Sequence, residues 1–286
     1  TAMLEHPATE ANLALLRSRG VQVLDSPSGA LTGADVGRGR MAEPEDIAEA
    51  VFIALDRLGA TKPTGDLEGF DVLVTAGGTR EPLDPVRFLG NASSGKQGFA
   101  IARAAAQRGA KVTTIAAPSS EPFPKVGEVV QVTTALEMEA AVKRAAPRMD
   151  LVVMAAAVAD YRPVKSEDTK IKRAGRETMQ LELMANPDIL AGLIANRRPG
   201  QVIVGFAAET GDRSASAVSY AASKARSKGA DLTVGNAVTG GAVFGSDANA
   251  VVIFDSKGRR VAAAEGPKAQ VADAILDAAK ALLPGE

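Results

Sequence analysis

From residue 70 onward, short apolar runs alternate with stretches whose apolar residues have helical spacing, and this alternation constrains the fold most strongly. The apolar runs predict buried strands at 70–76, 111–117, 151–157, 202–207 and 231–235. The helical patterns lie at 96–108, 134–146, 186–197 and 214–228. Alternating strands and helices are typical of an α/β domain, so we predict a Rossmann-like, mostly parallel sheet with helices on both faces.

The end of the chain predicts a C-terminal β-hairpin followed by a helix. Residues 249–263 form two apolar runs around Ser256, Lys257 and Gly258, and 267–283 has helical spacing. Two earlier helices also carry start signals. Thr134 with Glu137 fits a capping box, and Asn186 before Pro187 fits a helix cap.

Composition divides the chain into two domains. Residues 1–58 predict helices at 7–19 and 43–58 with a short strand at 21–24, whereas "GATKPTGDLEG" at 59–69 has the glycine, proline and charge content of a linker. The second domain then covers 70–286. Because the chain begins at Thr1 inside a helical pattern, we expect it to be the tail of something longer.

Bulk composition excludes several classes of function. The 286 residues carry a net charge of −1, which argues against a surface that coats nucleic acid. There is no cysteine, and the single histidine is His6, so thiolate nucleophiles and most histidine-based sites are excluded. No apolar run reaches the roughly 20 residues of a membrane span. We therefore expect a cytoplasmic protein without a membrane partner.

Binding sites in such folds lie beyond the carboxyl ends of the strands, so the polar residues that follow each strand are candidates. We expect these side chains to gather at one rim: Arg80, Arg87, Asn91, Lys96, Asp160, Lys170, Lys172, Glu209 and Asn236.

The stretch "GNASSGKQG" at 90–98 resembles a phosphate loop but departs from it twice. Gln97 stands where a magnesium-binding Ser or Thr belongs, and about 13 residues separate Ala76 from Gly90. We interpret the match as accidental. The small residues at 92–95 lead into a helix whose first N–H groups could still cradle an anion. An ordinary capped helix with a surface lysine is the alternative.

The stretch "YAASK" contains Tyr220 and Lys224 at the spacing of the acid–base pair of short-chain dehydrogenases. Those enzymes also need a glycine fingerprint after the first strand, and "TAGGTREPLD" has none. We therefore disfavour an oxidoreductase. Lys224 and Lys228 lie four residues apart on one helix face, where they could hold an anion or simply face solvent.

Seven stretches, in order over about 70–254, together resemble the phosphopantothenoylcysteine synthetase family, the ligase of coenzyme A biosynthesis. They are "TAGGTREPLDPVRFLGNASSGKQGFAIA", "TALEMEAAV", "AAAVADYRP" with "KIK", "NPDIL", "VGFAAET", "KARSK", and "VGNAV" with "FGSDANAV". The resemblance implies that the carboxylate of 4'-phosphopantothenate attacks the α-phosphate of CTP. Pyrophosphate leaves, and cysteine then displaces CMP from the acyl-cytidylate.

The resemblance also implies roles for individual residues. Asn91 would handle the acyl intermediate, Arg87 would place phosphopantothenate, and Lys170 would serve both catalysis and nucleotide binding. The remaining CTP residues would be Met154, Ala155, Ala156, Asp160, Pro187, Asp188, Ile189, Leu190, Phe206, Lys224 and Lys228. Mg²⁺ would accompany CTP, with unknown protein ligands. The family implies a homodimer formed through the ligase part, or a larger homo-oligomer with a full decarboxylase part.

Residues 1–58 resemble the carboxyl-terminal end of the FMN-dependent phosphopantothenoylcysteine decarboxylase, which precedes the synthetase in bacterial fusions. "HPATEANLALLRSRG" is similar to its late helix and "TGADVGRGRM" (32–41) to its active-site flap, although Gly33 replaces a cysteine common there. The catalytic and flavin-binding residues would precede Thr1, so we expect no decarboxylation by this chain alone. A non-catalytic nucleotide-binding domain and a short-chain-type oxidoreductase remain the alternative functions.

Overall fold

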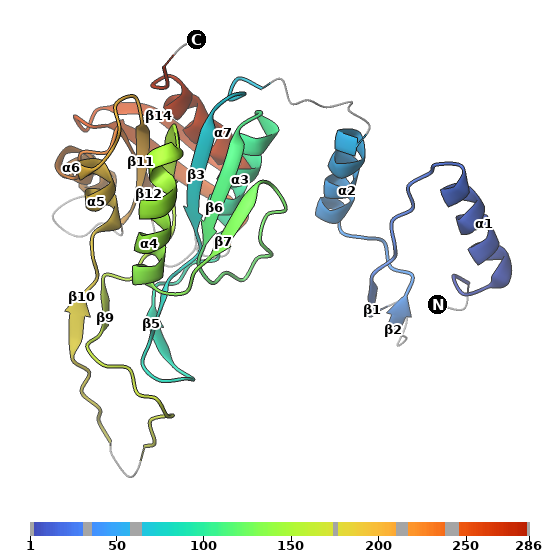
Figure 1. The fold of residues 1–286 in the computed structure, drawn as a ribbon, viewed down its shortest axis with the longest axis horizontal. Helices are drawn as coiled ribbons and strands as arrows, with labels where there is room; N and C mark the ends of the chain where they lie inside the picture. Colours follow the sequence, from blue (N-terminus) through green and yellow to red (C-terminus); the bar gives the residue numbers. More distant parts are fainter. Residues whose placement is uncertain are drawn as a thin grey trace. The chain divides into compact units, whose positions relative to one another are not determined.

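A computed structural model describes residues 3–30, 36–57, 65–173, 177–209, 217–237 and 246–284. The chain divides into two compact units, Thr1–Lys62 and Pro63–Glu286 (Figure 1). Residues 59–64 of the expected linker (59–69) lie outside the described residues, as do residues 32–35 of the flap-like segment (32–41), Gly33 among them.

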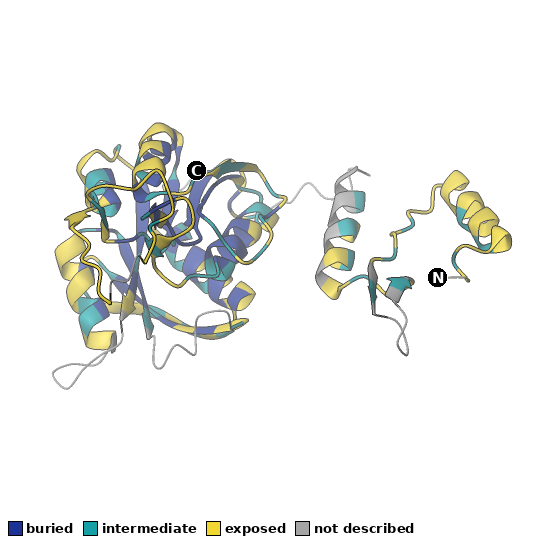
Figure 2. Ribbon diagram, turned by 90° about the horizontal axis from the view of Figure 1, so that it is seen from below, coloured by how far each residue is buried: buried dark blue, intermediate teal, exposed yellow. Residues whose placement is uncertain are grey.

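The described residues of the first unit form two helices and one small sheet. Helix α1 (Pro7–Ser18) begins where His6 Nδ1 accepts the N–H of Ala8 at 3.2 Å, and it buries none of its residues. Figure 2 shows this helix almost entirely exposed. Strands β1 (Ser28–Ala30) and β2 (Val36–Arg38) pair antiparallel before α2 (Pro44–Arg57). The strand expected at 21–24 is wrong: these residues form no ladder, and the described pairing joins β1 to β2.

The second unit is built on an eight-stranded sheet in the order β14-β13-β12-β11-β8-β3-β6-β7. Its strands are β3 (Asp71–Ala76), β6 (Lys111–Ala116), β7 (Glu128–Gln131), β8 (Leu151–Met154), β11 (Val202–Glu209), β12 (Leu232–Ala237), β13 (Ala248–Asp255) and β14 (Arg260–Pro267). All pairings from β7 to β12 are parallel, and β13 and β14 are antiparallel. The predicted mostly parallel sheet is confirmed, whereas the edge strand β7 was not predicted.

Helices cover both faces, as the alternation of strands and helices predicted. Along β3, Val72 and Val74 pack into one apolar cluster and Leu73 into another, because successive side chains of a strand point to opposite faces. Helices α3 (Lys96–Gln107) and α7 (Lys268–Lys280) cover the first face. Helices α4 (Ala135–Ala145) and α5 (Ile189–Ala195) cover the second, with α6 (Ala217–Lys228) packing on β11 and β12.

The sequence signals for helix starts and turns had different outcomes. The capping box of α4 is confirmed by reciprocal hydrogen bonds between Thr134 and Glu137. The hairpin from β13 to β14 is confirmed and turns through Gly258, whose φ is 72°. Asn186 does not cap α5; that helix begins at Ile189, where the Asp188 carboxylate accepts the N–H of Ala191 at 3.0 Å.

A small extension projects beyond the carboxyl edge of the large sheet. It consists of two antiparallel pairs, β4 (Arg80–Pro82) with β5 (Phe88–Gly90) and β9 (Tyr161–Pro163) with β10 (Leu183–Ala185). Strand β4 also contacts β9, so the two pairs form one body, visible below the sheet in Figure 1. We call these strands and the loops between them the extension (80–90 and 161–185); the sequence did not predict it.

Candidate nucleotide site

A cavity of about 270 Å³ opens at the carboxyl edge of the sheet, beyond β8 and β11. It is lined by Met154, Ala156, Val158, Ala159, Asp160, Asn186, Pro187, Asp188, Ile189, Leu190, Gly205, Phe206, Ala207, Lys224, Lys228 and Thr233. Ten of the residues expected to bind CTP therefore lie around one space. Ala155 and Lys170 do not line it.

The turn after β8 forms one wall of this cavity. The strand ends at Met154, and small residues follow, so the backbone is accessible to a ligand. Thr75 Oγ1 accepts the N–H of Ala156 at 3.1 Å and holds this turn against β3. Ala155 packs toward the α3 and α7 side of the sheet, which explains why it is absent from the cavity lining.

The opposite wall is the segment 186–190, which is joined to α6 by an ion pair. Lys228 Nζ lies 2.5 Å from Asp188 Oδ2, with both side chains partly exposed. Burial acts to raise the pKa of Asp188, but the Lys228 ammonium and the N–H of Ala191 outweigh it and hold that pKa below its usual value. Asp188 therefore both caps α5 and anchors Lys228 across the cavity.

The predicted placement of Lys224 and Lys228 on one helix face is confirmed, since both line the cavity. Phe206 lies there too, within β11, where a planar ring could pack against a base. The cavity thus combines a hydrophobic ring, two cationic side chains and an exposed carboxylate, Asp160. Such a set can hold a polar, planar and anionic ligand.

Arg87 is fixed by a buried aspartate on the extension. Asp84 Oδ2 accepts Nε and Nη2 of Arg87 at 2.9 and 2.6 Å, and its carboxylate also accepts the backbone N–H groups of Val86, Arg87 and Ile171. Burial acts to raise the pKa of Asp84, but these N–H groups and the guanidinium lower it far below its usual range. Arg87 Nη2 also donates to the Ile171 carbonyl at 2.5 Å.

Asn91 lies beside the cavity and Lys170 lies away from it. Asn91 Nδ2 donates to the carbonyl of Val158, a cavity residue, at 2.9 Å. Lys170 lines a second cavity, of about 540 Å³, formed within the extension between 163–172 and 179–182. The structure therefore places Asn91 near the turn after β8 and Arg87 in the extension. It does not bring Lys170 into the nucleotide cavity.

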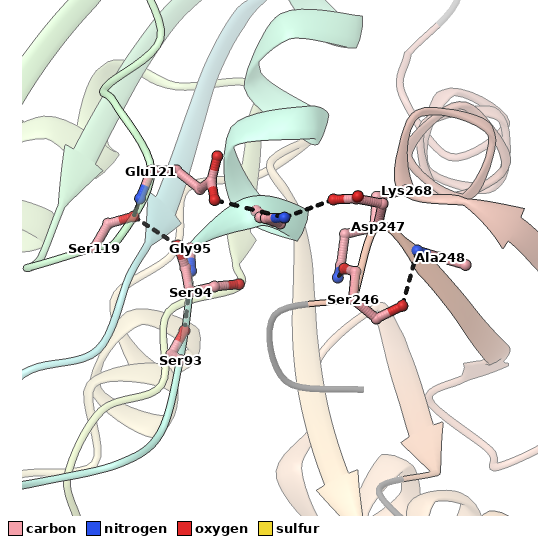
Figure 3. A network of polar contacts seen from close by, with 10 residues as sticks. Ser93, Ser94, Gly95, Ser119, Glu121, Ser246, Asp247, Ala248 and Lys268 are labelled. Atoms are coloured by element: carbon pink, nitrogen blue, oxygen red, sulfur yellow. Dashed lines mark hydrogen bonds and ion pairs between the residues drawn. The ribbon is translucent and has the colours of Figure 1, made fainter. Parts of the chain in front are cut away.

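The start of α3 carries a network of charged side chains (Figure 3). Gly95, with φ 77°, caps the helix without any side-chain hydrogen bond. Lys96 Nζ lies 2.5 Å from Asp247 and 3.5 Å from Glu121, and the pKa of Lys96 is raised, chiefly by Asp247. The pKa of Lys268 is lowered by burial and by the nearby Lys96 charge. Strands β4 and β5 separate β3 from α3, which is not the direct strand-to-helix turn of a phosphate loop.

The other rim candidates are scattered. Arg80 lies over the ring of Phe88, 4.6 Å from its centroid, and Lys172 lines the extension cavity. Asn236 is the penultimate residue of β12, and its buried Oδ1 has no hydrogen-bond partner in the described part of the chain. The side chain of Glu209 lies outside the described residues.

No group of three or more acidic or histidine side chains that could hold a metal is present among the described residues. Likewise, none of the helices in the described ranges is long and apolar enough to cross a bilayer. Tyr220 and Lys224 both lie on α6, one turn apart.

Sequence reasoning missed Asn186 as a site residue and misread it as a helix cap. Its side chain lines the cavity and donates to the Ala159 carbonyl at 2.8 Å. The other lining residues that were missed carry no residue type that marks a site; they are Val158, Ala159, Gly205, Ala207 and Thr233.

Comparison with known proteins identifies the family. Residues 67–282 match the model of the DNA/pantothenate metabolism flavoprotein C-terminal domain. The coenzyme A biosynthesis bifunctional protein CoaBC of Mycobacterium tuberculosis H37Rv is 47% identical, over 100% of this chain and 69% of its own length. The protein of the same name from Escherichia coli K12 is 41% identical over 91% of this chain and 62% of its own.

Solved structures agree. The crystal structure of a CoaBC C-terminal domain superimposes with a TM-score of 0.61 at 35% identity, covering 76% of this chain and 97% of that domain. A Cab2 mutant in complex with phosphopantothenate-cysteine has a TM-score of 0.59 at 18% identity, covering 84% and 96%, and shows likeness of fold alone. The chain belongs to the CoaBC family, and its second unit is a DNA/pantothenate metabolism flavoprotein C-terminal domain.

Proposed function

We propose that this chain is a phosphopantothenate–cysteine ligase that uses CTP. The observation that carries the proposal is the single cavity that collects the strand end after β8, the segment 186–190, Phe206 and two lysines. Membership of a family whose relatives act in coenzyme A biosynthesis supports it. The proposal includes a cytoplasmic location, which agrees with a sequence free of cysteine.

In the first half-reaction a carboxylate oxygen of 4'-phosphopantothenate attacks the α-phosphorus of CTP. The bond from that phosphorus to the bridging oxygen breaks, and pyrophosphate leaves with the electron pair. In the second, the cysteine amine attacks the acyl carbon, CMP leaves, and the amine loses a proton. Because the nucleophiles come from the substrates, the protein has to orient the reactants and neutralise charge.

We assign these tasks to side chains in and beside the cavity. Phe206 would face the nucleoside, and Lys224 would neutralise phosphate charge; both line the cavity. Asp188 holds Lys228 in an ion pair. We therefore assign two tasks to Lys228: it closes the cavity wall, and it attracts the anionic ligand. Asn91, which reaches the turn after β8, would hydrogen-bond the acyl carbonyl, and Arg87 would place phosphopantothenate.

Lys170 requires a separate statement, because it lies in the extension and lines a different cavity. We keep Lys170 as a nucleotide-binding and catalytic candidate. Its part in the reaction then requires either a shift of the segment 165–173 or a second copy of the chain that offers its own cavity.

Magnesium fits this cavity as a companion of the triphosphate. Asp160 offers an exposed carboxylate on the cavity wall, and Mg²⁺ commonly takes one or two carboxylates together with phosphate oxygens. When bound, the ion would withdraw charge from the phosphate oxygens and ease departure of pyrophosphate.

We further propose a homodimer formed through the extension. Its exposed apolar side chains include Val86, Phe88, Tyr161, Val164, Met179, Leu181, Leu183 and Met184. Apolar surface of this extent is typical of an interaction site. The first unit we assign to the carboxyl-terminal part of an FMN-dependent decarboxylase domain, with FMN belonging to the remainder of that domain.

The experiment that tests the function is pyrophosphate release with 4'-phosphopantothenate and Mg²⁺, comparing CTP with ATP, each with and without cysteine. We expect CTP-dependent release, and an amide product when cysteine is added. Turnover of a nicotinamide instead would favour an oxidoreductase. CTP binding without release by a folded sample would leave a nucleotide-binding domain.

A further inference from the structure

Two segments that are separated in the sequence lie side by side in the lining of the nucleotide cavity, and one residue joins them. The first wall is the turn containing Ala159 and Asp160, and the second begins at Asn186. Asn186 donates twice to the first wall: its Nδ2 to the Ala159 carbonyl at 2.8 Å, and its backbone N–H to the Asp160 carbonyl at 2.8 Å. The Asn186 side chain therefore lines the cavity and also connects its two walls.

A neighbouring arginine fixes which way the Asn186 amide points. Arg162 Nη1 donates to Asn186 Oδ1 at 2.9 Å and to the Ala185 carbonyl at 2.9 Å. The amide oxygen thus faces a cation and the amide nitrogen faces a carbonyl. An amide is a side chain that offers an acceptor and a donor on one planar group. An aspartate of the same shape satisfies Arg162 but sets an oxygen against the Ala159 carbonyl.

The consequence is a fixed width for the cavity mouth. Each of the two walls carries a carboxylate close to this connection. The Asp160 carbonyl itself accepts the Asn186 N–H, and Asp188 follows Asn186 by two residues. If the Asn186 side chain is lost, the backbone N–H of residue 186 and the pairing of β9 with β10 still join the two walls, but the side-chain tie to the Ala159 carbonyl and to Arg162 is gone, so the walls are held less firmly. Ligand groups would then meet a looser set of partners, and binding depends on how well the partners are held in place.

We propose that Asn186 is a positioning residue for the nucleotide, oriented by Arg162, that sets the spacing of the two cavity walls. The inference rests on the proposed CTP-dependent function and adds a residue with a stated role to it. It concerns binding, so the chemical step at saturating CTP should be little affected.

The test is Asn186→Ala in the full chain, with steady-state pyrophosphate release and calorimetric CTP binding. We expect KM and Kd for CTP to rise about tenfold, the size expected from losing two hydrogen bonds. The kcat at saturating CTP and the KM for phosphopantothenate should stay within about twofold. A merely structural defect would lower the active fraction and hence kcat, and would leave KM for CTP unchanged.

The matched control is Asn196→Ala, at the C-terminal end of helix α5, which follows Asn186. Asn196 Nδ2 also donates to a carbonyl, that of Gly192, at 2.8 Å, but it caps the far end of α5 outside the cavity. This variant should leave KM and Kd for CTP unchanged. Arg162→Ala should raise both, and Arg162→Ala combined with Asn186→Ala should bind CTP no more weakly than Asn186→Ala alone.

Three results would overturn the inference: a folded Asn186→Ala protein with unchanged CTP affinity, a loss confined to kcat, or additive effects of the two substitutions. If Asn186→Ala does not fold, Asn186→Asp and Arg162→Ala decide by the same measurements. If the wild-type chain binds CTP but releases no pyrophosphate, the ligase proposal fails, and the calorimetric comparison still judges Asn186. A wild-type chain that binds no CTP would overturn both.

Discussion

The part of the molecule around the large sheet buries a phenylalanine, whereas the extension leaves an equivalent kind of residue exposed: Phe99 is buried and Phe88 is not. Phe99, on α3, is fully buried and meets Phe123 edge to face, with ring centroids 6.0 Å apart. Phe88, on β5, is 50% exposed. The sheet buries its apolar groups within one chain, whereas the extension leaves a row of them at the surface beside Arg87 and Lys170. This difference is the basis of the proposal that the extension forms the dimer.

The largest expected effect tests this contrast directly with one substitution in two places. Phe99→Ala should lower the free energy of unfolding by about 4 kcal/mol, because it leaves a large cavity in the core. In the monomer, Phe88→Ala should lower it by less than about 1 kcal/mol, because half of the side chain is already exposed there. Both are measured by denaturant unfolding monitored by circular dichroism. Equal losses would mean that Phe88 is buried in the native protein.

The same pair of variants separates stability from assembly. Analytical ultracentrifugation of Phe88→Ala should show a shift toward monomer if the extension forms the dimer. A variant that remains as associated as the wild type would remove the extension from the interface.

The free energy of unfolding should depend on pH in the acid range because the extension contains a buried carboxylate, that of Asp84. The pKa of Asp84 is lower in the folded chain than in the unfolded chain, so the unfolded state binds the proton more readily. The stabilisation by Asp84 is therefore complete above an unfolded pKa of about 3.9 and declines as the pH falls through the lower folded value.

Asp84→Asn tests this, with unfolding followed at pH 7 and at successively lower pH. The difference in unfolding free energy between wild type and variant should be largest near neutral pH and should narrow below about pH 4. A difference that is constant with pH would show that the Asp84 charge contributes nothing and that its hydrogen bonds alone matter.

A smaller effect is expected from two substitutions on helix α6, at Lys224 and Tyr220. Lys224→Gln should weaken CTP binding about tenfold, because it removes a charged partner of phosphate. Tyr220→Phe should change turnover less than about twofold. Calorimetry and pyrophosphate release measure the two. Loss of activity in Tyr220→Phe would restore the acid–base interpretation of the "YAASK" stretch.

The smallest effect is expected at surface ion pairs, where the two regions should behave alike. Glu139 and Lys143 pair on α4 at 2.6 Å, and Lys165 pairs with Glu167 in the extension at 3.1 Å. Glu139→Ala and Glu167→Ala should each cost about 0.5 kcal/mol or less, and less still at high salt. A cost above about 1 kcal/mol at only one of these sites would show that the regions differ in their electrostatics as well.

Much of the fold was predictable because it depends on local periodicity. The strands that the alternation predicted are those buried on both faces, such as β3 and β8, and the capping box of α4 needs residues only three apart. Strand β7 escaped prediction because "EVVQ" is short and only half-buried, and β4, β5, β9 and β10 each have three residues. Such short strands are stabilised by pairing with a neighbouring strand, and a local sequence pattern does not reveal that pairing.

The sequence alone determined the doubly wound sheet, the residue types at its carboxyl edge and the family, since periodicity and ordered motifs are properties of the linear chain. Only the tertiary structure decided that Asn186 connects the cavity walls, that Asp188 holds Lys228, and that Lys170 lines another cavity. The reason is physical. Asn186 and Ala159 are 27 residues apart, and Lys228 and Asp188 are 40 residues apart, so these contacts form only when the fold brings the segments together.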